Sequence, residues 1–380
     1  MRLLVVSHPP LRRELGAAQT AMNLAESLRA LGHEVVLWSP EPLPEGTRWY
    51  LRWIAQRRKL EALLEGAEPF DVIDVPPVSI SRRLGRYGAV VARSVQPDPS
   101  YFWFDIREGL RRRPLSPRNV AHALHALVLT GAIVLGWHRA RLVATLGSAE
   151  SRWIRRRVPW LGPRLRHYFN APSPEEQARL AGVRRARRPP QGPGLRFLWI
   201  GRWAAHKGTG RLIRFLRSRL ARCPHDTFTL AGCGPGVDRD LRDRGLDLDR
   251  IRVIPSFPRP ELPALLAGHD VGLFTSEAEG WGLCVNEMLE SGLPVYATPA
   301  GAAMDLAPLA PGQLEPFPPP DDLAPGSLGG PGDLSRYHEQ VTWPRIAARY
   351  EAEVLQDPRL AIRRTLAAPP DGDERTSTVE

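Results

Sequence analysis

The sequence predicts an α/β fold of two domains, each built on a parallel β-sheet with helices on both faces. Its 380 residues and 43% hydrophobic content are enough for two buried cores. Short apolar runs alternate with helical segments twice along the chain, and the Pro/Gly-rich stretch 187–194 interrupts them. These features exclude a chain disordered throughout and a protein that crosses a membrane repeatedly.

The first domain is expected to span residues 1–190. Its predicted strands are short apolar runs, which suit buried parallel strands: Leu3–Ser7, Val35–Trp38, Phe70–Val75, Ala89–Arg93 and Leu142–Leu146. Apolar residues recur at helical spacing over Ala17–Leu31, and Gly32 is placed to end that helix.

The second domain is expected to span residues 191–342, after the linker 187–194. Its predicted strands are Leu195–Ile200, Thr227–Ala231, Arg252–Ile254, Val271–Phe274 and Val295–Ala297, and its predicted helices are Thr209–Leu220, Pro263–Gly268 and Val285–Ser291. The Pro/Gly-rich segment 308–332 is predicted to be a long loop. Residues 343–366 are expected to form a last helix that packs back toward the first domain, and 367–380 a flexible tail. A cleft between the domains is the expected ligand site.

Charge is distributed unevenly. The net charge is +11 with a pI near 10.3, but residues 1–190 carry 31 Arg and Lys against 16 Asp and Glu, and residues 191–380 carry 21 against 25. Lys59 and Lys207 are the only lysines, so the arginine excess also reflects a compositional bias. The three cysteines are too few for a disulfide framework, and we expect a reduced, cytoplasmic compartment.

Aromatic and basic residues occur together in the first half. Trp49–Trp53 precedes Arg57–Lys59, and Tyr101–Phe104 precedes Arg111–Arg113. This combination suits the interface of an anionic membrane, and ordinary core packing explains it equally well. The apolar segment 121–137 is predicted to be a buried helix rather than a membrane span, because it is short and contains His122, His125 and Thr130.

The strongest chemical signal lies in two segments of the second half. Gly201–Gly208 (GRWAAHKG) follows a predicted strand and opens a helix, and Glu279–Glu287 (EGWGLCVNE) lies between another strand and helix. Arg202 and Lys207 can neutralise a diphosphate leaving group together with backbone N–H groups at a helix N-terminus, without a metal ion. Because the chain has only two lysines, the presence of one at this position of the motif argues that the motif is not a chance match.

These motifs resemble the retaining glycosyltransferases of family 4, a group 1 glycosyltransferase family with the GT-B architecture of two facing Rossmann-like domains. Further positions that support the resemblance are Gly232–Pro235, Gly16 with the helix after it, Asn170, and Thr342–Ile346. The resemblance implies sugar transfer, with retention at the anomeric carbon, from a nucleotide-diphosphate sugar to an acceptor. The donor is expected to be a UDP- or GDP-sugar, and the acceptor a glycan, a lipid-linked molecule or a small molecule.

The resemblance also assigns roles to residues. Glu279 would bind hydroxyls of the donor sugar and Glu287 those of the ribose. Gly280, Trp281, Gly282 and Leu283 would place main-chain groups beside the phosphates and the sugar, with Gly16 on the opposite domain. Arg202 and Lys207 would hold the diphosphate. The base would be read by main-chain groups around Ile254, and no cofactor or metal is expected.

One position departs from the family. Relatives commonly have Arg-x-His after the fourth strand, whereas this chain has Arg93-Ser94-Val95, so valine replaces the histidine that faces the donor sugar. Gln96 or Asp98 could take its place after a small loop shift. His8, just past the first strand, is a further candidate, and a structural role suits it as well.

Two other kinds of function remain as alternatives. A nucleotide-sugar-binding pseudoenzyme or regulatory subunit is favoured by Val95, and a nucleic-acid-binding protein by the basic first half, although no nucleic-acid motif is present. Asp-x-Asp triplets at 238–240, 247–249 and 371–373 can chelate a metal–diphosphate in a different fold, but the first two lie in a charge-rich stretch typical of a solvated surface.

Overall fold

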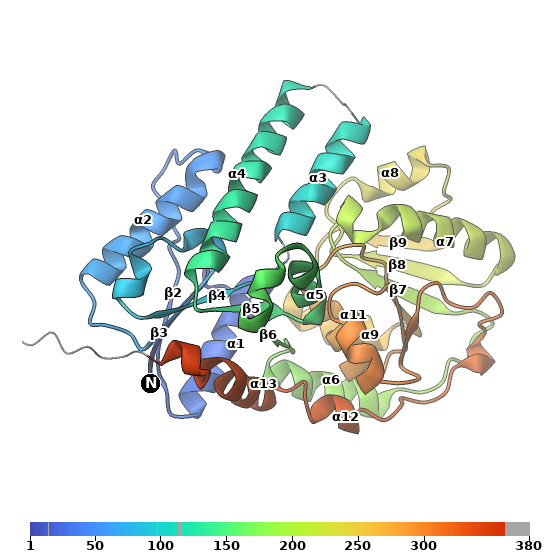
Figure 1. Ribbon diagram of the computed structural model, residues 1–380. Helices are drawn as coiled ribbons and strands as arrows, with labels where there is room; N and C mark the ends of the chain where they lie inside the picture. Colours follow the sequence, from blue (N-terminus) through green and yellow to red (C-terminus); the bar gives the residue numbers. More distant parts are fainter. Residues whose placement is uncertain (14, 97, 113–115, 362–380) are drawn as a thin grey trace, which may run out of the picture.

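A computed structural model describes residues 1–13, 15–96, 98–112 and 116–361. It contains two six-stranded sheets whose strands all run parallel to their neighbours. The strand orders are β2-β1-β3-β4-β5-β6 and β12-β11-β10-β7-β8-β9. Figure 1 shows the two sheets side by side with helices around each, so the predicted α/β class with two parallel sheets is confirmed.

The first sheet and its helices come from the first half of the chain. The strands are β1 (Arg2–Val6), β2 (Glu34–Trp38), β3 (Val72–Val75), β4 (Ala89–Arg93), β5 (Leu142–Leu146) and β6 (Leu165–Tyr168). The helices are α1 (Gly16–Ala30), α2 (Arg52–Glu65), α3 (Asp98–Arg112), α4 (Pro117–Arg139), α5 (Ser148–Arg157) and α6 (Pro174–Ala186).

The second sheet follows the linker 187–194, in which the structure has neither helix nor strand. Its strands are β7 (Arg196–Ile200), β8 (Thr227–Ala231), β9 (Ile251–Ile254), β10 (Val271–Phe274), β11 (Val295–Ala297) and β12 (Leu314–Pro316). The helices are α7 (Thr209–Arg222), α8 (Val237–Asp243), α9 (Leu262–Ala267), α10 (Leu283–Glu290), α11 (Ala303–Leu306), α12 (Ser335–His338) and α13 (Trp343–Tyr350).

The sequence did not predict β6 or β12, each of which lies at an edge of its sheet. An edge strand is covered less completely, so it lacks the continuous apolar run of a central strand. β6 contains Arg166 and His167, and β12 is three residues ending in Pro316 inside the segment predicted to be a loop. Proline is tolerated there because an edge strand has one side without ladder bonds.

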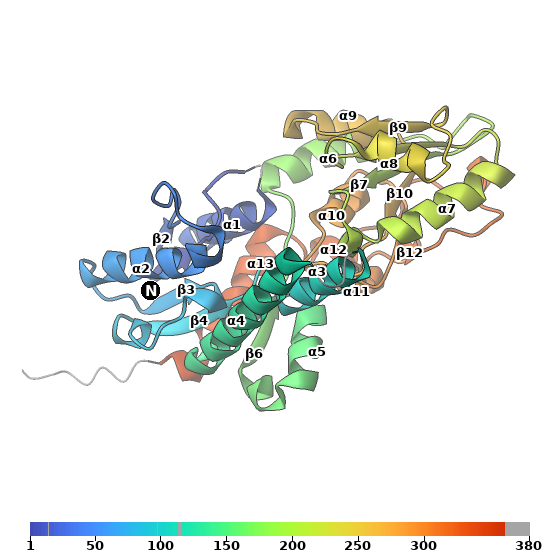
Figure 2. The same cartoon turned by 90° about the horizontal axis from the view of Figure 1, so that it is seen from above.

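The prediction of a buried helix at 121–137 was wrong. α4 is long and apolar enough to cross a membrane by length and composition, and only 22% of its most apolar stretch is buried. Its exposed face includes Leu124, Leu127, Val128 and Leu135. Figures 1 and 2 show why: α3 and α4 pack side by side as a pair that projects from the sheet, so most of α4 has nothing to cover it.

Successive side chains of each strand point to opposite faces of its sheet. Leu3 and Val5 of β1 enter one cluster and Leu4 and Val6 the cluster on the opposite face. The first of these clusters continues into the second half of the chain, where it includes Val285 of α10. The two sheets therefore share one apolar core through their facing sides.

Two helices cross between the halves of the chain. α6, which precedes the linker, packs on α9 and α10 of the second sheet. α13 returns to the first sheet and packs on α1 and β6, with the Trp343 indole donating a hydrogen bond to the Ala171 carbonyl at 3.0 Å. The expected tail 367–380 lies outside the described residues.

Arg93 belongs to this structural framework. Its guanidinium is buried, pairs with the Asp74 carboxylate and donates to the Val6 carbonyl at 2.9 Å. The Tyr350 hydroxyl of α13 donates to the same carboxylate. Burial opposes the charge of Arg93, but Asp74 holds the pKa of the guanidinium above its ordinary value. This network ties β1, β3, β4 and α13 together.

We expect Asp74→Ala to destabilise the protein by about 3–5 kcal/mol, because it leaves the Arg93 charge buried without its carboxylate. Tyr350→Phe removes one hydrogen bond to Asp74 and should cost about 1 kcal/mol. Urea unfolding of the intact chain measures both changes. A loss below 1 kcal/mol for Asp74→Ala would contradict the structural role of the pair.

Candidate functional site

A polar cavity of about 360 Å³ lies between the two sheets, where strands of both point their carboxyl ends. Most of the site residues predicted from the sequence line this cavity. They are Gly16, Gln96, Asn170, Arg202, Lys207, Glu279, Gly280, Trp281, Gly282, Leu283 and Glu287. The structure therefore brings together motifs that lie far apart in the chain.

Three candidates lie elsewhere. Arg93 is committed to Asp74, and His8 is half-buried with its Nε2 2.7 Å from the Ser79 hydroxyl. Burial and the nearby Arg93 lower the pKa of His8 to about 4, so the ring is neutral at pH 7. Ile254 ends β9, and its carbonyl accepts the Gly232 N–H at 2.9 Å. None of the three residues lines the polar cavity, and the polar groups described here make contacts within the fold.

Lys207 and Glu279 form an ion pair inside the cavity. The same Glu279 carboxylate accepts hydrogen bonds from the Ser276 hydroxyl at 3.1 Å and the Tyr101 hydroxyl at 3.1 Å. Tyr101 comes from α3 of the first domain and its ring packs edge-on to His206. Burial and the neighbouring Glu279 raise the pKa of Tyr101, so its hydroxyl keeps the proton that it donates.

A second charged group lies on the opposite wall. Arg259 donates to Glu287 at 2.7 Å and to Glu176 at 2.6 Å. Glu176 caps α6 and also accepts from the Gln19 amide of α1 at 2.7 Å. Burial opposes the charge of Arg259, but the two carboxylates hold its pKa above the ordinary value. This chain of contacts joins both domains beside the cavity.

Close backbone packing places these groups. A Cβ added to Gly280 would lie 2.5 Å from the Val95 carbonyl oxygen, so only glycine lets the turn approach the loop after β4. Gly208, at φ +70°, would place a Cβ 1.8 Å from the Thr275 carbonyl oxygen. These contacts hold the Lys207 turn against β10 and the Gly280 turn against Gln96.

Asn170 lines the cavity but uses its side chain for structure. Its amide donates to the Thr20 hydroxyl at 3.0 Å, and its oxygen accepts the Ala171 N–H at 3.0 Å. The Asn286 amide donates to the Asn170 carbonyl at 3.3 Å across the domain boundary. Asn170 is therefore a positioning residue between α1 and α10.

The lining carries more positive than negative charge. Arg13, Arg202, Lys207 and Arg259 face Glu279 and Glu287, and Arg202 is exposed at the mouth. α10 begins at Leu283, so its first N–H groups are directed into the same space. Cations and N–H groups beside two carboxylates suit a ligand with a phosphate end and a hydroxyl-rich end.

Metal ligands are not gathered anywhere in the part of the chain that the structure describes: no group of three His, Cys, Asp or Glu side chains is placed to hold an ion. Asp238 and Asp240 instead pair with Arg242 and Arg244 on exposed α8. The triplet at 371–373 lies outside the described residues. All three cysteines are free, and burial raises the pKa of Cys284 at the cavity to about 12.

Further residues line the cavity that the sequence did not predict for the site, among them Tyr101, Arg259, Arg13 and Gln19. The sequence grouped Tyr101 with aromatic residues that suit a membrane interface. Its hydroxyl instead contacts Glu279, which lies 178 residues away in the sequence. Arg259 was one arginine among many, in a chain where arginine is the commonest cation. No local pattern marks either residue, because both reach the cavity through tertiary packing.

Comparison with known proteins agrees with the motifs. Residues 194–313 match the family described as glycosyl transferases group 1. The Bacillus subtilis (strain 168) protein called uncharacterized glycosyltransferase YqgM is 28% identical over 121 residues, which are 31% of this chain and 34% of that protein. The match thus spans about a third of the relative's length.

Solved structures are similar over nearly the whole chain. Sucrose-phosphate synthase from Thermosynechococcus elongatus has a TM-score of 0.67 at 17% identity, covering 93% of this chain and 98% of that one. Anabaena HepE, in complex with UDP and glucose, has 0.58 at 17% identity over 94% and 99%. WaaG, a glycosyltransferase involved in lipopolysaccharide biosynthesis, has 0.55 at 15% identity over 94% and 95%.

At these identities the structural likeness establishes the fold. The chain has the GT-B fold of two facing Rossmann-like domains, and residues 194–313 of its second half match the group 1 glycosyl transferases. The fold expected from the sequence motifs is confirmed, and the family match agrees with the resemblance.

We expect Gly280→Ala to destabilise the protein by about 1–3 kcal/mol, because the added methyl group forces the turn away from the Val95 carbonyl. Gly210→Ala is the matched control, since a Cβ there meets nothing within 4 Å in α7. It should be neutral or slightly stabilising. Equal urea midpoints for the two variants would show that the Gly280 contact does not hold the domains together.

Proposed function

We propose that this protein is a retaining, metal-independent glycosyltransferase of family 4 that moves a sugar from a nucleotide-diphosphate sugar to an acceptor. The observation that carries the proposal is the Lys207–Glu279 pair, set beside Arg202 and the start of α10 in one cavity. The segment that the group 1 family matches contains all of these residues.

The donor diphosphate would occupy the basic side of the cavity. Arg202, Lys207 and the N–H groups at the start of α10 would neutralise the charge that develops on the leaving phosphate oxygen. Since side chains supply this positive charge, the reaction needs no metal ion. Binding would move Lys207 from its present carboxylate partner toward the phosphates.

Glu279 would then accept hydrogen bonds from hydroxyls of the donor sugar. Tyr101 and Ser276 hold its carboxylate in place. Glu287, fixed by Arg259, would accept from the ribose hydroxyls. Anabaena HepE, which shares the fold, has been solved with UDP-glucose, and this favours a UDP-sugar over a GDP-sugar as the first donor to test.

Retention would follow from attack on the face that the diphosphate leaves. As the glycosidic bond lengthens toward an oxocarbenium-like transition state, the acceptor hydroxyl passes its proton to a leaving phosphate oxygen and bonds to the anomeric carbon. The hydrogen bonds from Tyr101 and Ser276 stabilise the Glu279 carboxylate and so lower its nucleophilicity, which suits this route.

A nucleotide-sugar-binding pseudoenzyme is the second candidate, because valine occupies position 95 at the cavity. The neighbouring Gln96 amide donates to Asp98 at 2.5 Å, and burial raises the pKa of Asp98 to about 6. Gln96 faces the cavity and can take the place of the missing imidazole as a hydrogen-bond donor. An active enzyme would use Gln96 in this way, whereas a pseudoenzyme would bind the donor and transfer its sugar to no acceptor.

We expect UDP without added metal to stabilise the protein, by about 2.7 kcal/mol at 100 times its Kd. Lys207→Ala should abolish the shift in a thermal unfolding assay, whereas Lys59→Ala, the only other lysine, should leave it unchanged. GDP, ADP, CDP and dTDP form the comparison panel. No shift with any nucleotide would contradict the proposal, and a product of inverted anomeric configuration would contradict retention.

We also propose that the protein works in the cytoplasm at the inner face of an anionic membrane, with no nucleic-acid partner. The exposed apolar face of α4 lies near exposed Trp49, Trp103 and Leu110. Arg107, Arg111 and Arg118 are exposed on the same helix pair. Apolar side chains flanked by arginines suit insertion among acidic headgroups.

The membrane proposal predicts sedimentation with vesicles of phosphatidylglycerol but much less with vesicles of phosphatidylcholine alone. Leu124→Gln with Val128→Gln should weaken sedimentation at least tenfold. Leu31→Gln, at an exposed apolar position just past the end of α1, is the control and should not weaken sedimentation. Equal binding by the double variant and the parent would locate the membrane surface elsewhere, or show that there is none.

A further inference from the structure

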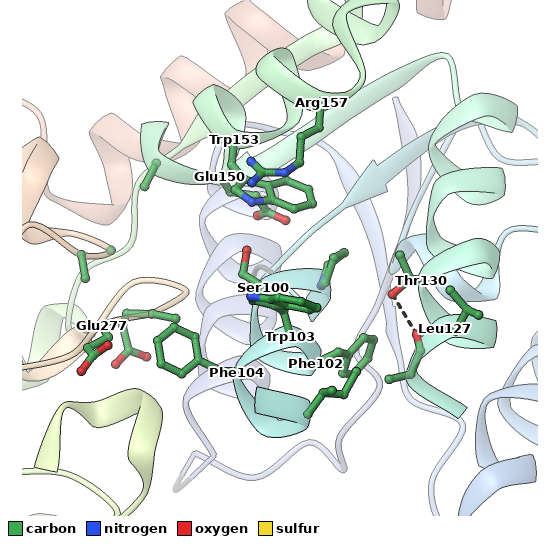
Figure 3. A pocket seen from close by; sticks show the side chains of 18 of the residues that line it. Ser100, Phe102, Trp103, Phe104, Leu127, Thr130, Glu150, Trp153, Arg157 and Glu277 are labelled. Atoms are coloured by element: carbon green, nitrogen blue, oxygen red, sulfur yellow. Dashed lines mark hydrogen bonds between the residues drawn. The ribbon is translucent and has the colours of Figure 1, made fainter. Parts of the chain in front are cut away.

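A second cavity, of about 830 Å³, adjoins the polar one and shares Glu279 with it. Side chains from α3, α4 and α5 surround it, and loops of the second domain close its other end. In Figure 3, Phe102 of α3 lies on the side of Leu127 of α4, Trp103 lies below Trp153 of α5, and Phe104 points toward Glu277 at the second-domain end. Most of this wall is hydrocarbon and aromatic.

The apolar cavity opens onto the exposed face of α4. Leu127 lines the cavity and is 70% exposed, and Trp103 lines it and is 66% exposed. Apolar side chains thus continue without interruption from the cavity wall to the surface of the helix pair. A large exposed apolar patch marks a place where an apolar molecule or surface makes contact.

One polar group in the cavity wall is unusual. Glu150 of α5 is buried, and its Oε1 accepts the Ser94 hydroxyl at 2.8 Å. Among the residues that the structure describes, its Oε2 has no hydrogen-bond partner. Burial raises the pKa of Glu150 to about 8, so the carboxyl is mostly protonated at pH 7. A neutral carboxyl is compatible with an apolar occupant and has a hydrogen bond left to make.

We propose that the apolar cavity holds the hydrocarbon chain of a lipid acceptor, whose hydroxyl lies at Glu279 and receives the sugar. This inference rests on the proposed function and names its acceptor class. The volume falls in the range of pockets that enclose a medium-sized organic ligand. A glycan would leave its hydroxyls unpaired against the phenyl and indole rings, whereas a hydrocarbon chain gains by leaving water.

The position of the mouth also favours a lipid. A chain that enters beside Leu127 comes from the exposed apolar face of α4, which is the face proposed to meet the membrane. The Glu150 carboxyl would donate its proton to an oxygen near the head of the chain. The hydroxyl at the inner end would reach the boundary between the two cavities, where Glu279 marks the donor sugar.

Binding of a dansyl-labelled undecanol to the intact protein tests the inference, because dansyl fluorescence increases in an apolar site. The parent should bind this probe, and Ala123→Trp, which fills the cavity from α4, should weaken binding at least tenfold. Leu31→Trp places the same side chain at an exposed position just past the end of α1, outside the cavity lining, and should change the Kd less than twofold. Phe104→Ala, which removes part of the wall, should weaken binding severalfold and serves if Ala123→Trp does not fold.

Stabilisation by UDP, measured on the same samples, separates this inference from the proposed function. If UDP stabilises the parent and Ala123→Trp equally while only the parent binds the probe, both proposals are supported. If UDP binds and the probe does not, or if Leu31→Trp weakens probe binding as much as Ala123→Trp does, the lipid chain is not held in this cavity and the inference is wrong. If the probe binds the cavity and no nucleotide binds, the proposed function fails and the apolar site stands.

Discussion

The contact between the Gly280 turn and the Val95 carbonyl is the constraint on which the geometry of the cleft depends. Because glycine has no Cβ, the two domains meet there backbone to backbone. That approach brings α3 within reach of the second domain, so the Tyr101 hydroxyl can meet Glu279 at 3.1 Å. Larger side chains at this point would separate the two halves of the site.

Two cations of the cleft, Lys207 and Arg259, are each paired with carboxylates before any ligand binds. Lys207 faces Glu279, and Arg259 faces Glu287 and Glu176. These pairs keep long side chains in defined positions, so little conformational entropy remains to be lost on binding. In the proposed reaction, a diphosphate would replace the Glu279 carboxylate as the partner of Lys207. That carboxylate would then be available to the hydroxyls of the donor sugar.

The two adjoining cavities differ in the chemical character of their walls. The polar one presents cations and carboxylates, and the apolar one presents rings and aliphatic side chains, with Glu279 between them. In the proposed reaction, exclusion of water from the apolar side would favour transfer to an acceptor alcohol over hydrolysis. The projecting pair of α3 and α4 supplies both the wall of the apolar cavity and its exposed approach (Figures 1 and 2).

Local sequence was sufficient to predict the central strands, the linker and the two motifs around Lys207 and Glu279. Apolar periodicity and glycine-rich turns act over a few residues, so they are visible without tertiary structure. Edge strands β6 and β12 lack that periodicity. The exposure of α4 arises because α3 covers only one side of it and no other described element covers most of the rest. Tyr101, Arg259 and Glu150 gain their roles from residues distant in the chain, and burial is the main cause of the raised pKa of Glu150. The sequence by itself determined the class of fold and identified the two motifs that line the polar cavity. Only the packing of the two domains decided which side chains complete that site and that an apolar cavity adjoins it.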